Sequence, residues 1–65
     1  MKENVPIQNK IALTVQEAAA YSNIGRNKLN ELLKLPGCPF VLYVGSKKLI
    51  KRREFEKFIS DSIEL

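Results

Sequence analysis

The side chains best suited to recognising another molecule gather on one short predicted helix, over residues 26–34. Asn27 and Lys34 lie on its outer face together with Glu31, and Asn30 flanks them. Arg26 and Lys28 lie on the two shoulders near its N-terminal end. Asparagine and arginine make two-pronged hydrogen bonds to the edges of adenine and guanine, so these residue types indicate a helix that can read base pairs. An ordinary solvated helix face is the alternative, and the helix alone does not separate the two.

The residue types give little support to catalysis. There is no histidine, and the lone Cys38 stands in a loop, Pro36–Pro39, with no base to activate it. No pair of carboxylates is placed in a way that suggests acid–base work. We therefore expect an inert loop thiol, no enzyme activity, and neither a metal nor a cofactor.

The net charge of +4 is distributed unevenly along the chain. Residues 1–25 are neutral, because two lysines are balanced by two glutamates. Residues 26–53 carry eight basic side chains against Glu31 alone, a net charge of +7, whereas residues 54–65 carry −3. Charge concentrated in this way is typical of a protein that contacts phosphate.

A second basic group belongs to a predicted β-hairpin. Phe40–Val44 is rich in β-branched and aromatic residues, which predicts a strand, and Lys48–Ile50 predicts the returning strand. Gly45 and Ser46 have the form of a two-residue hairpin turn, and they are followed at the tip by Lys47 and Lys48. A basic hairpin tip of this kind resembles a DNA-contacting wing; the alternative is that the lysines protect an edge strand from aggregation.

Three more basic residues follow the hairpin: Lys51, Arg52 and Arg53. They are candidate phosphate contacts, and the alternative is solvated charge. The sequence does not separate these two interpretations.

The basic helix is preceded by another helix and a tight turn. Thr14 and Glu17 have the spacing of a capping box, and alanines at helical spacing carry the first helix to about Tyr21. Residues 22–25 supply turn chemistry, and the second helix then continues to about residue 34 or 35, before Pro36 and Gly37. Its expected buried face consists of Leu29, Leu32 and Leu33. The result is the outline of a helix-turn-helix.

Two further elements complete the predicted domain. Apolar residues alternate at Ile11 and Leu13, which favours a short strand leading into the capping box. The helical pattern recurs at Phe55, Phe58 and Ile59, with Ile63 extending the same face, so a third amphipathic helix closes the core. We expect one α+β domain over residues 10–65, preceded by a flexible arm over residues 1–9.

This order of strand, helix, turn, helix, hairpin and helix resembles the excisionase family of small, MerR-like winged helix-turn-helix DNA-binding proteins. The chain looks most similar to the excisionases of conjugative transposons from low-GC Gram-positive bacteria. The resemblance covers nearly the whole chain and is carried by the wing and by three stretches: LTVQEAA at residues 13–19, IGRNKL at 24–29 and IKRREFEKFI at 50–59. Many relatives have Ser or Thr where this chain has Gly25, and Ser where it has Lys51.

The resemblance implies an accessory protein without chemistry of its own. Such a protein binds sites in the arms that flank an element's end, bends double-stranded DNA, and helps a tyrosine-type integrase to excise the element. The predicted recognition helix and wing would then contact DNA, and the acidic C-terminal segment becomes a candidate integrase-facing surface, with a solvated helix end as its alternative.

We expect a cytoplasmic monomer without a membrane segment, and leave open cooperative binding on DNA. Two other functions stay open: a winged-helix transcriptional regulator that binds an operator, and a module that binds protein alone.

Overall fold

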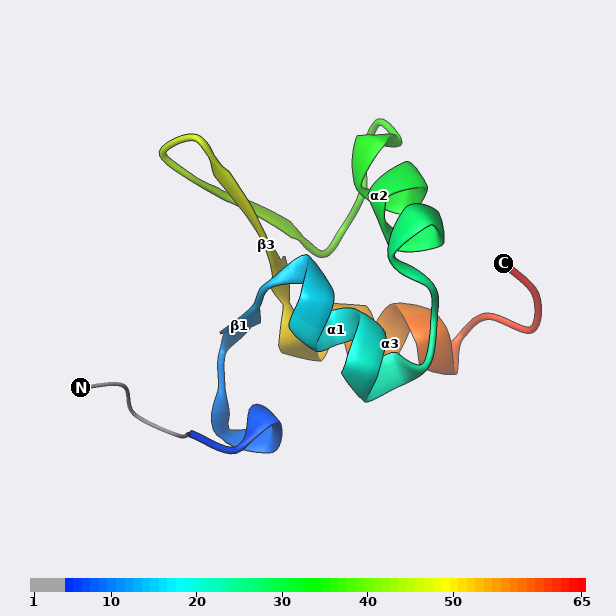
Figure 1. Ribbon diagram of the computed structural model, residues 1–65. Coiled ribbons are helices and arrows are strands. Elements are labelled where there is room, and N and C mark those ends of the chain that lie inside the picture. The colour runs from blue at the N-terminus through cyan, green and yellow to red at the C-terminus, as the bar shows by residue number, and fades with distance from the viewer. Residues whose placement is uncertain (1–4) are drawn as a thin grey trace.

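The computed structural model describes residues 5–65 of the chain, and Figure 1 shows their arrangement. The elements follow one another as η1 (Ile7–Asn9), β1 (Ala12–Leu13), α1 (Val15–Ser22), α2 (Arg26–Lys34), β2 (Val41–Val44), β3 (Lys47–Lys51) and α3 (Arg52–Ser60). Three helices and a three-stranded antiparallel sheet make a small α+β fold of the winged-helix kind, which confirms the predicted fold class. The predicted domain boundary near residue 10 stays a prediction, and the first four residues of the predicted arm lie outside the described residues.

Helix α1 begins with a side-chain cap and ends with a backbone cap in the left-handed conformation. The Thr14 hydroxyl accepts from the Glu17 amide, and the Glu17 carboxylate accepts from the Thr14 amide, each at 3.0 Å, so the predicted capping box is confirmed. At the other end Asn23 adopts a left-handed conformation with φ of 64°, and its amide donates to the Ala19 carbonyl. Asparagine tolerates this conformation better than most residues, which is why the turn into α2 can be tight.

The sheet has the strand order β1-β3-β2, so the returning strand of the hairpin lies in the centre. The turn at Gly45 and Ser46 sets Val44 opposite Lys47 and Tyr43 opposite Lys48. Gly45 has a φ of 61°, which glycine adopts at little cost, and the predicted hairpin is thereby confirmed. At the other end of β3, the Arg52 amide donates to the Ile11 carbonyl at 2.9 Å, which joins β1 to the start of α3.

The core lies where the sheet base meets the three helices. Its buried side chains come from every helix and from the sheet base: Leu13, Ala18, Leu29, Leu32, Leu33, Phe40, Ile50 and Phe55. The Phe40 ring packs edge-on against Phe55 with centroids 5.2 Å apart, and it lies 5.1 Å from the Phe58 ring. The hairpin end beyond Val41 is not part of this core, so the wing projects from it (Figure 1).

Two apolar positions differ from the sequence-based expectation. The apolar face of the third helix was predicted to extend to Ile63, and this is wrong, because α3 ends at Ser60 and Ile63 is fully exposed. The strand at Ile11 and Leu13 is present but short, and only Leu13 is buried, whereas Ile11 is 86% exposed. In the preceding segment, residues 7–9 form a single 3-10 turn from which Ile7 packs against the core.

Candidate nucleic-acid interface

Helix α2 presents one buried and one exposed face, as its sequence pattern predicted. Leu29, Leu32 and Leu33 are buried, and they fix the rotation of the helix on the core. The opposite face is exposed and carries the predicted contact residues Arg26, Asn27, Asn30 and Lys34. The helix starts at Gly25 without a side-chain cap, so its first amide groups are available to other acceptors.

The three basic residues of α2 differ in how freely their charge can act. Lys28 is half-buried and lies 3.8 Å from the Glu31 carboxylate, a long and exposed ion pair that offsets part of its charge. Within residues 5–65, neither Arg26 nor Lys34 forms an ion pair. The positive potential of the helix therefore comes mainly from its two ends.

The hairpin places the predicted wing residues at its free end. Gly45, Ser46, Lys47 and Lys48 are all exposed. Figure 1 shows the hairpin tip and α2 projecting toward the same side of the molecule, with α1, α3 and β1 at the opposite side. The structure thus brings α2 and the wing tip to one end of the molecule.

The three basic residues after the hairpin are separate from this end. Lys51 closes β3 at the base of the sheet, at the far end of the strand from the wing tip. Arg52 is only 16% exposed: its Nε donates to the Lys10 carbonyl at 2.7 Å, and a terminal nitrogen lies 3.1 Å from the Glu56 carboxylate. Arg53 is exposed beside it. Arg52 therefore has an internal role that neither sequence-based interpretation had included.

Glu56 receives a second donor, the Tyr21 hydroxyl of α1. The Tyr21 hydrogen bond and the neighbouring Arg52 lower the pKa of Glu56 below its ordinary value of 4.5. The hydrogen bond to the same carboxylate raises the pKa of Tyr21 above its ordinary value of 10.0, because deprotonation would remove the donated proton, and the negative charge of Glu56 acts in the same direction. This group of side chains connects α1 and α3 with the segment before β1.

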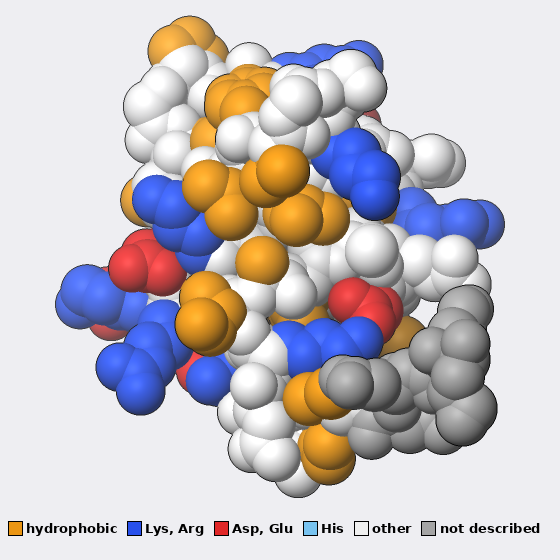
Figure 2. All heavy atoms as spheres, turned by 90° about the vertical axis from the view of Figure 1, so that its left-hand side faces the viewer, with side chains coloured by type: hydrophobic (Ala, Val, Ile, Leu, Met, Phe, Trp, Pro, Cys, Tyr) orange, Lys and Arg blue, Asp and Glu red, His pale blue; other side chains and the backbone are white. Residues whose placement is uncertain are grey.

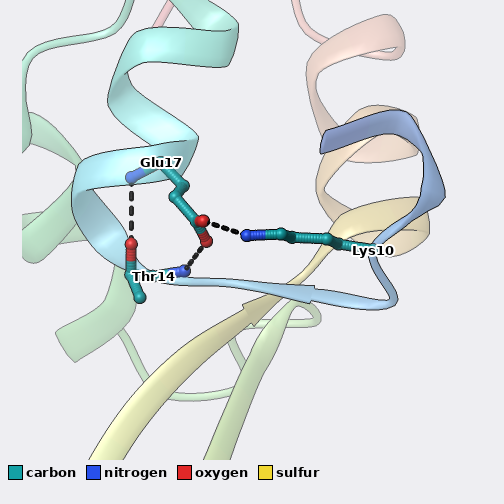
Figure 3. A network of polar contacts seen from close by, with 3 residues as sticks. All are labelled: Lys10, Thr14 and Glu17. Carbon is teal, nitrogen blue, oxygen red and sulfur yellow. Dashed lines mark hydrogen bonds and ion pairs between the residues drawn. The ribbon is translucent and has the colours of Figure 1, made fainter. Parts of the chain in front are cut away.

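A related contact fixes the start of the helix-turn-helix (Figure 3). The Lys10 ammonium donates to the Glu17 carboxylate, which also accepts from the Thr14 amide. Both hydrogen bonds lower the pKa of Glu17 below 4.5, with the lysine as the larger cause. The capping box is therefore joined to the residue that precedes β1.

Comparison with known proteins gives the same family as the sequence pattern. Residues 1–63 match the protein family described as "Excisionase from transposon Tn916". A curated protein of that name from Streptococcus agalactiae serotype V is 37% identical over 57 residues, which cover 86% of this chain and 85% of that protein. The chain belongs to the Tn916 excisionase family. The predicted resemblance is confirmed, and with it an excisionase role in transposon excision.

Membership of the excisionase family does not by itself assign roles to single residues. The recognition-helix, wing and sheet-base residues named above stay predictions as DNA contacts. Sequence reasoning also passed over Tyr43, which the two-residue turn pairs with Lys48 at the end of the wing. The length of that turn was the signal that could have found it.

None of the helices among residues 5–65 has the length and apolar character needed to cross a membrane.

Proposed function

We propose that this excisionase acts as an architectural DNA-binding protein at the ends of its element. The observation that carries the proposal is the placement of two exposed basic elements, α2 and the hairpin tip, on one side of a Tn916-family excisionase. A helix fits the major groove of B-DNA, and a projecting hairpin can reach the neighbouring groove. Its site of action is the cytoplasm, where the element's DNA is found.

Each element has a separate part in this proposal. Asn27 and Asn30, with Arg26 at the helix entrance, read base edges, and Lys34 adds a charge at the far end of α2. Lys47 and Lys48 contact phosphates or the minor groove from the wing, where Gly45 and Ser46 let the backbone approach closely. At the sheet base, exposed Arg53 and half-buried Lys51 are better candidates for phosphate than Arg52, whose guanidinium is held by Lys10 and Glu56.

The binding energy of these contacts would be used to deform DNA. Bending a site by tens of degrees costs about 1–6 kcal/mol, and contacts by the concentrated basic charge can offset that cost. The bent site then presents the element's end to a tyrosine-type integrase, which performs all bond cleavage and joining. The acidic residues of α3 and the C-terminal segment lie on elements away from the hairpin tip, which supports them as the surface that faces integrase.

A reconstituted excision reaction tests the proposal. Integrase, a DNA molecule carrying both element ends and increasing amounts of the protein are mixed, and excised circles are counted. We expect excision to rise with occupancy of the arm sites and then to reach a plateau, because the protein acts by stoichiometric binding.

The same reaction is repeated with the double variant Arg26→Ala/Asn27→Ala, which should fold but not bind DNA. Both side chains are exposed, so the variant should keep its circular dichroism spectrum while its DNA binding and its stimulation of excision disappear together. Full excision in the absence of the protein would remove the proposed role and leave an operator-binding regulator. Stimulation by a variant that no longer binds DNA would assign the function to protein contacts alone.

A further inference from the structure

Two apolar side chains stand exposed beside the lysines of the wing. Tyr43 is 63% exposed and Val44 is 50% exposed, although both belong to a regular strand. Neither belongs to the core or to the apolar residues packed against it. A solvent-facing aromatic ring at the tip of a projecting hairpin contributes little to the fold and is available for contact with another molecule.

The strand register shows which face Tyr43 occupies. Residues directly opposite in an antiparallel pair share a face, and every second residue returns to it. Tyr43 pairs with Lys48, and two residues further along the strands Val41 pairs with Ile50, which is fully buried. Tyr43 and Lys48 therefore extend the core-facing side of the hairpin beyond the core, while Val44 and Lys47 share the other side. In Figure 1 the hairpin end lies across from α2.

The charge around Tyr43 indicates the chemistry of its partner. Tyr43 is paired with Lys48, and Val44 is paired with Lys47. From residue 32 to residue 53 the chain has no Asp or Glu, so no acid within this stretch offsets either lysine. Figure 2, which views the left-hand side of Figure 1, shows apolar side chains down the middle of this face with Lys and Arg on both sides, while Asp and Glu accompany the basic side chains in its lower half. An apolar surface bordered by positive charge fits a polyanion with apolar parts. The minor groove of DNA has deoxyribose walls, is about 6 Å wide, and offers acceptor atoms on adenine and thymine.

We propose that Tyr43 is a DNA-contacting residue, with its ring against deoxyribose and base edges in the minor groove. Its hydroxyl can donate to a base or phosphate acceptor, as amphipathic tyrosines do at polar boundaries, and Lys48 on the same face holds the adjoining phosphate. Side chains wedged into the minor groove bend the duplex toward the major groove. This inference rests on the proposed function and specifies which wing residue helps to bend the site.

The aromatic content of the chain makes a direct test practical. There are two tyrosines and no tryptophan, so Tyr21→Phe leaves Tyr43 as the single fluorescent reporter. In this variant we expect acrylamide to quench the free protein readily, and to quench it several-fold less once a duplex carrying the element's arm site is saturated. Acrylamide is neutral, so it does not disturb the salt-dependent binding itself.

Three substitutions then separate the parts of the contact. Tyr43→Ala should weaken binding about tenfold, and it should reduce the bend, measured by gel mobility with permuted sites, by about 20° or more. Tyr43→Phe should keep the bend and most of the affinity, because the ring is retained. Ile63→Ala is the matched control: it removes a fully exposed apolar side chain on the C-terminal segment and should change neither quantity.

Each outcome distinguishes this inference from the function on which it rests. If Tyr43 stays accessible to acrylamide in a saturated complex, Tyr43 is not a DNA contact, while the proposed DNA-bending function survives. If Tyr43→Ala keeps the affinity and the bend on the duplex but no longer stimulates excision, the partner of Tyr43 is protein and the inference is wrong. If the wild-type protein fails to bind the duplex, the proposed function is overturned and this inference with it.

Discussion

Asn27 is the residue on which base reading can be tested most directly. It lies in the first turn of α2, exposed and opposite the buried leucines. If its amide makes a two-pronged bond to adenine, Asn27→Ala should cost about 1–3 kcal/mol on the cognate site and far less on random DNA. Competition binding on both duplexes at one salt concentration measures the difference.

The outcome on random DNA decides what Asn27 contacts. An equal reduction of affinity on both duplexes would show that the side chain meets phosphate, since phosphate contacts are independent of sequence. Ser60→Ala, an exposed position at the end of α3, serves as a control that should leave both affinities unchanged.

Glu17 predicts how stability depends on pH. Its pKa is lowered in the fold, first by Lys10 and then by Thr14, so the ionised form stabilises the folded state. This stabilisation is present above the ordinary pKa of 4.5 and is lost as the pH falls through the lower, folded value. Glu17→Gln keeps a capping acceptor but removes the charge, so it should be less stable than wild type at pH 7, and the difference should shrink as the pH falls from 4.5 toward pH 3.

Urea denaturation at the two pH values measures this effect. Glu56 also has a lowered pKa, but it is present in both proteins and therefore cancels in the comparison. Glu31→Gln removes a mostly exposed carboxylate whose partner is 3.8 Å away, and it should have little effect at either pH. A constant difference between wild type and Glu17→Gln from pH 7 to pH 3 would contradict the role of the Glu17 charge.

At the scale of elements, the charge of the wing should contribute to DNA binding independently of the rest of the fold. Lys47 and Lys48 project with the hairpin, beyond the core. The double variant Lys47→Ala/Lys48→Ala should flatten the dependence of log affinity on log salt concentration by roughly 0.9 for each phosphate that the protein no longer neutralises. Lys57→Ala, on α3 and in an ion pair with Asp61, is the control that should keep the slope. A wild-type slope in the double variant would mean that these lysines contact no phosphate, and would favour the alternative that they protect the outer part of β3, which β1 does not reach, from aggregation.

Helix α3 begins with two neighbouring arginines that have different roles. Arg52 is held by the Lys10 carbonyl and by Glu56, whereas Arg53 is exposed. We expect Arg52→Gln to lower the free energy of unfolding by about 1–3 kcal/mol, because it removes charged hydrogen bonds at a mostly buried site. Arg53→Gln should leave stability unchanged and reduce only the salt slope of DNA binding.

Denaturation and salt titrations on both variants decide between these roles. Equal stability of the two variants would show that the Arg52 contacts contribute nothing to the fold. A reduced salt slope for Arg52→Gln, at unchanged stability, would return Arg52 to the group of phosphate contacts.

The elements whose limits were predicted well are those with local signals. The capping box at Thr14 and Glu17, the break at Pro36 and the turn at Gly45 each act within a few residues, so their effect can be read from the sequence. The end of α3 has no such signal: the apolar spacing continues to Ile63, while the helix stops at Ser60.

The role of Arg52 could not be predicted, because its partner carbonyl on Lys10 is 42 residues away in sequence. The contact between Tyr21 and Glu56 spans 35 residues and was hidden for the same reason. The exposed face of α2 could be predicted because three buried leucines fix its rotation. Which of its exposed residues contact DNA also depends on the sequence and shape of the DNA site, which the protein sequence does not specify.

At the scale of the whole molecule, the proposed mechanism has one arrangement of elements contact two grooves at once. The groups around Glu17 and Glu56 connect α1 and α3 with the segment before β1, and α2 packs on the same core. The base of the hairpin packs on this core through Val41 and Ile50, so we expect DNA that contacts both the wing and α2 to adapt its shape to the protein. A bend produced in this way has a direction as well as a size.

That direction leads to a prediction about spacing. A bend helps integrase only if it points the arm toward the integrase core site, and inserted base pairs rotate it around the helix axis. An insertion of about 5 base pairs, half a helical turn, between the two sites should impair excision, whereas about 10 should partly restore it. Excision assays on the two insertions, with binding of the protein to its own site measured in parallel, separate phasing from a change in affinity. If excision is indifferent to the insertions while binding is unchanged, bending is not the mechanism, and direct recruitment of integrase by the α3 side of the molecule takes its place.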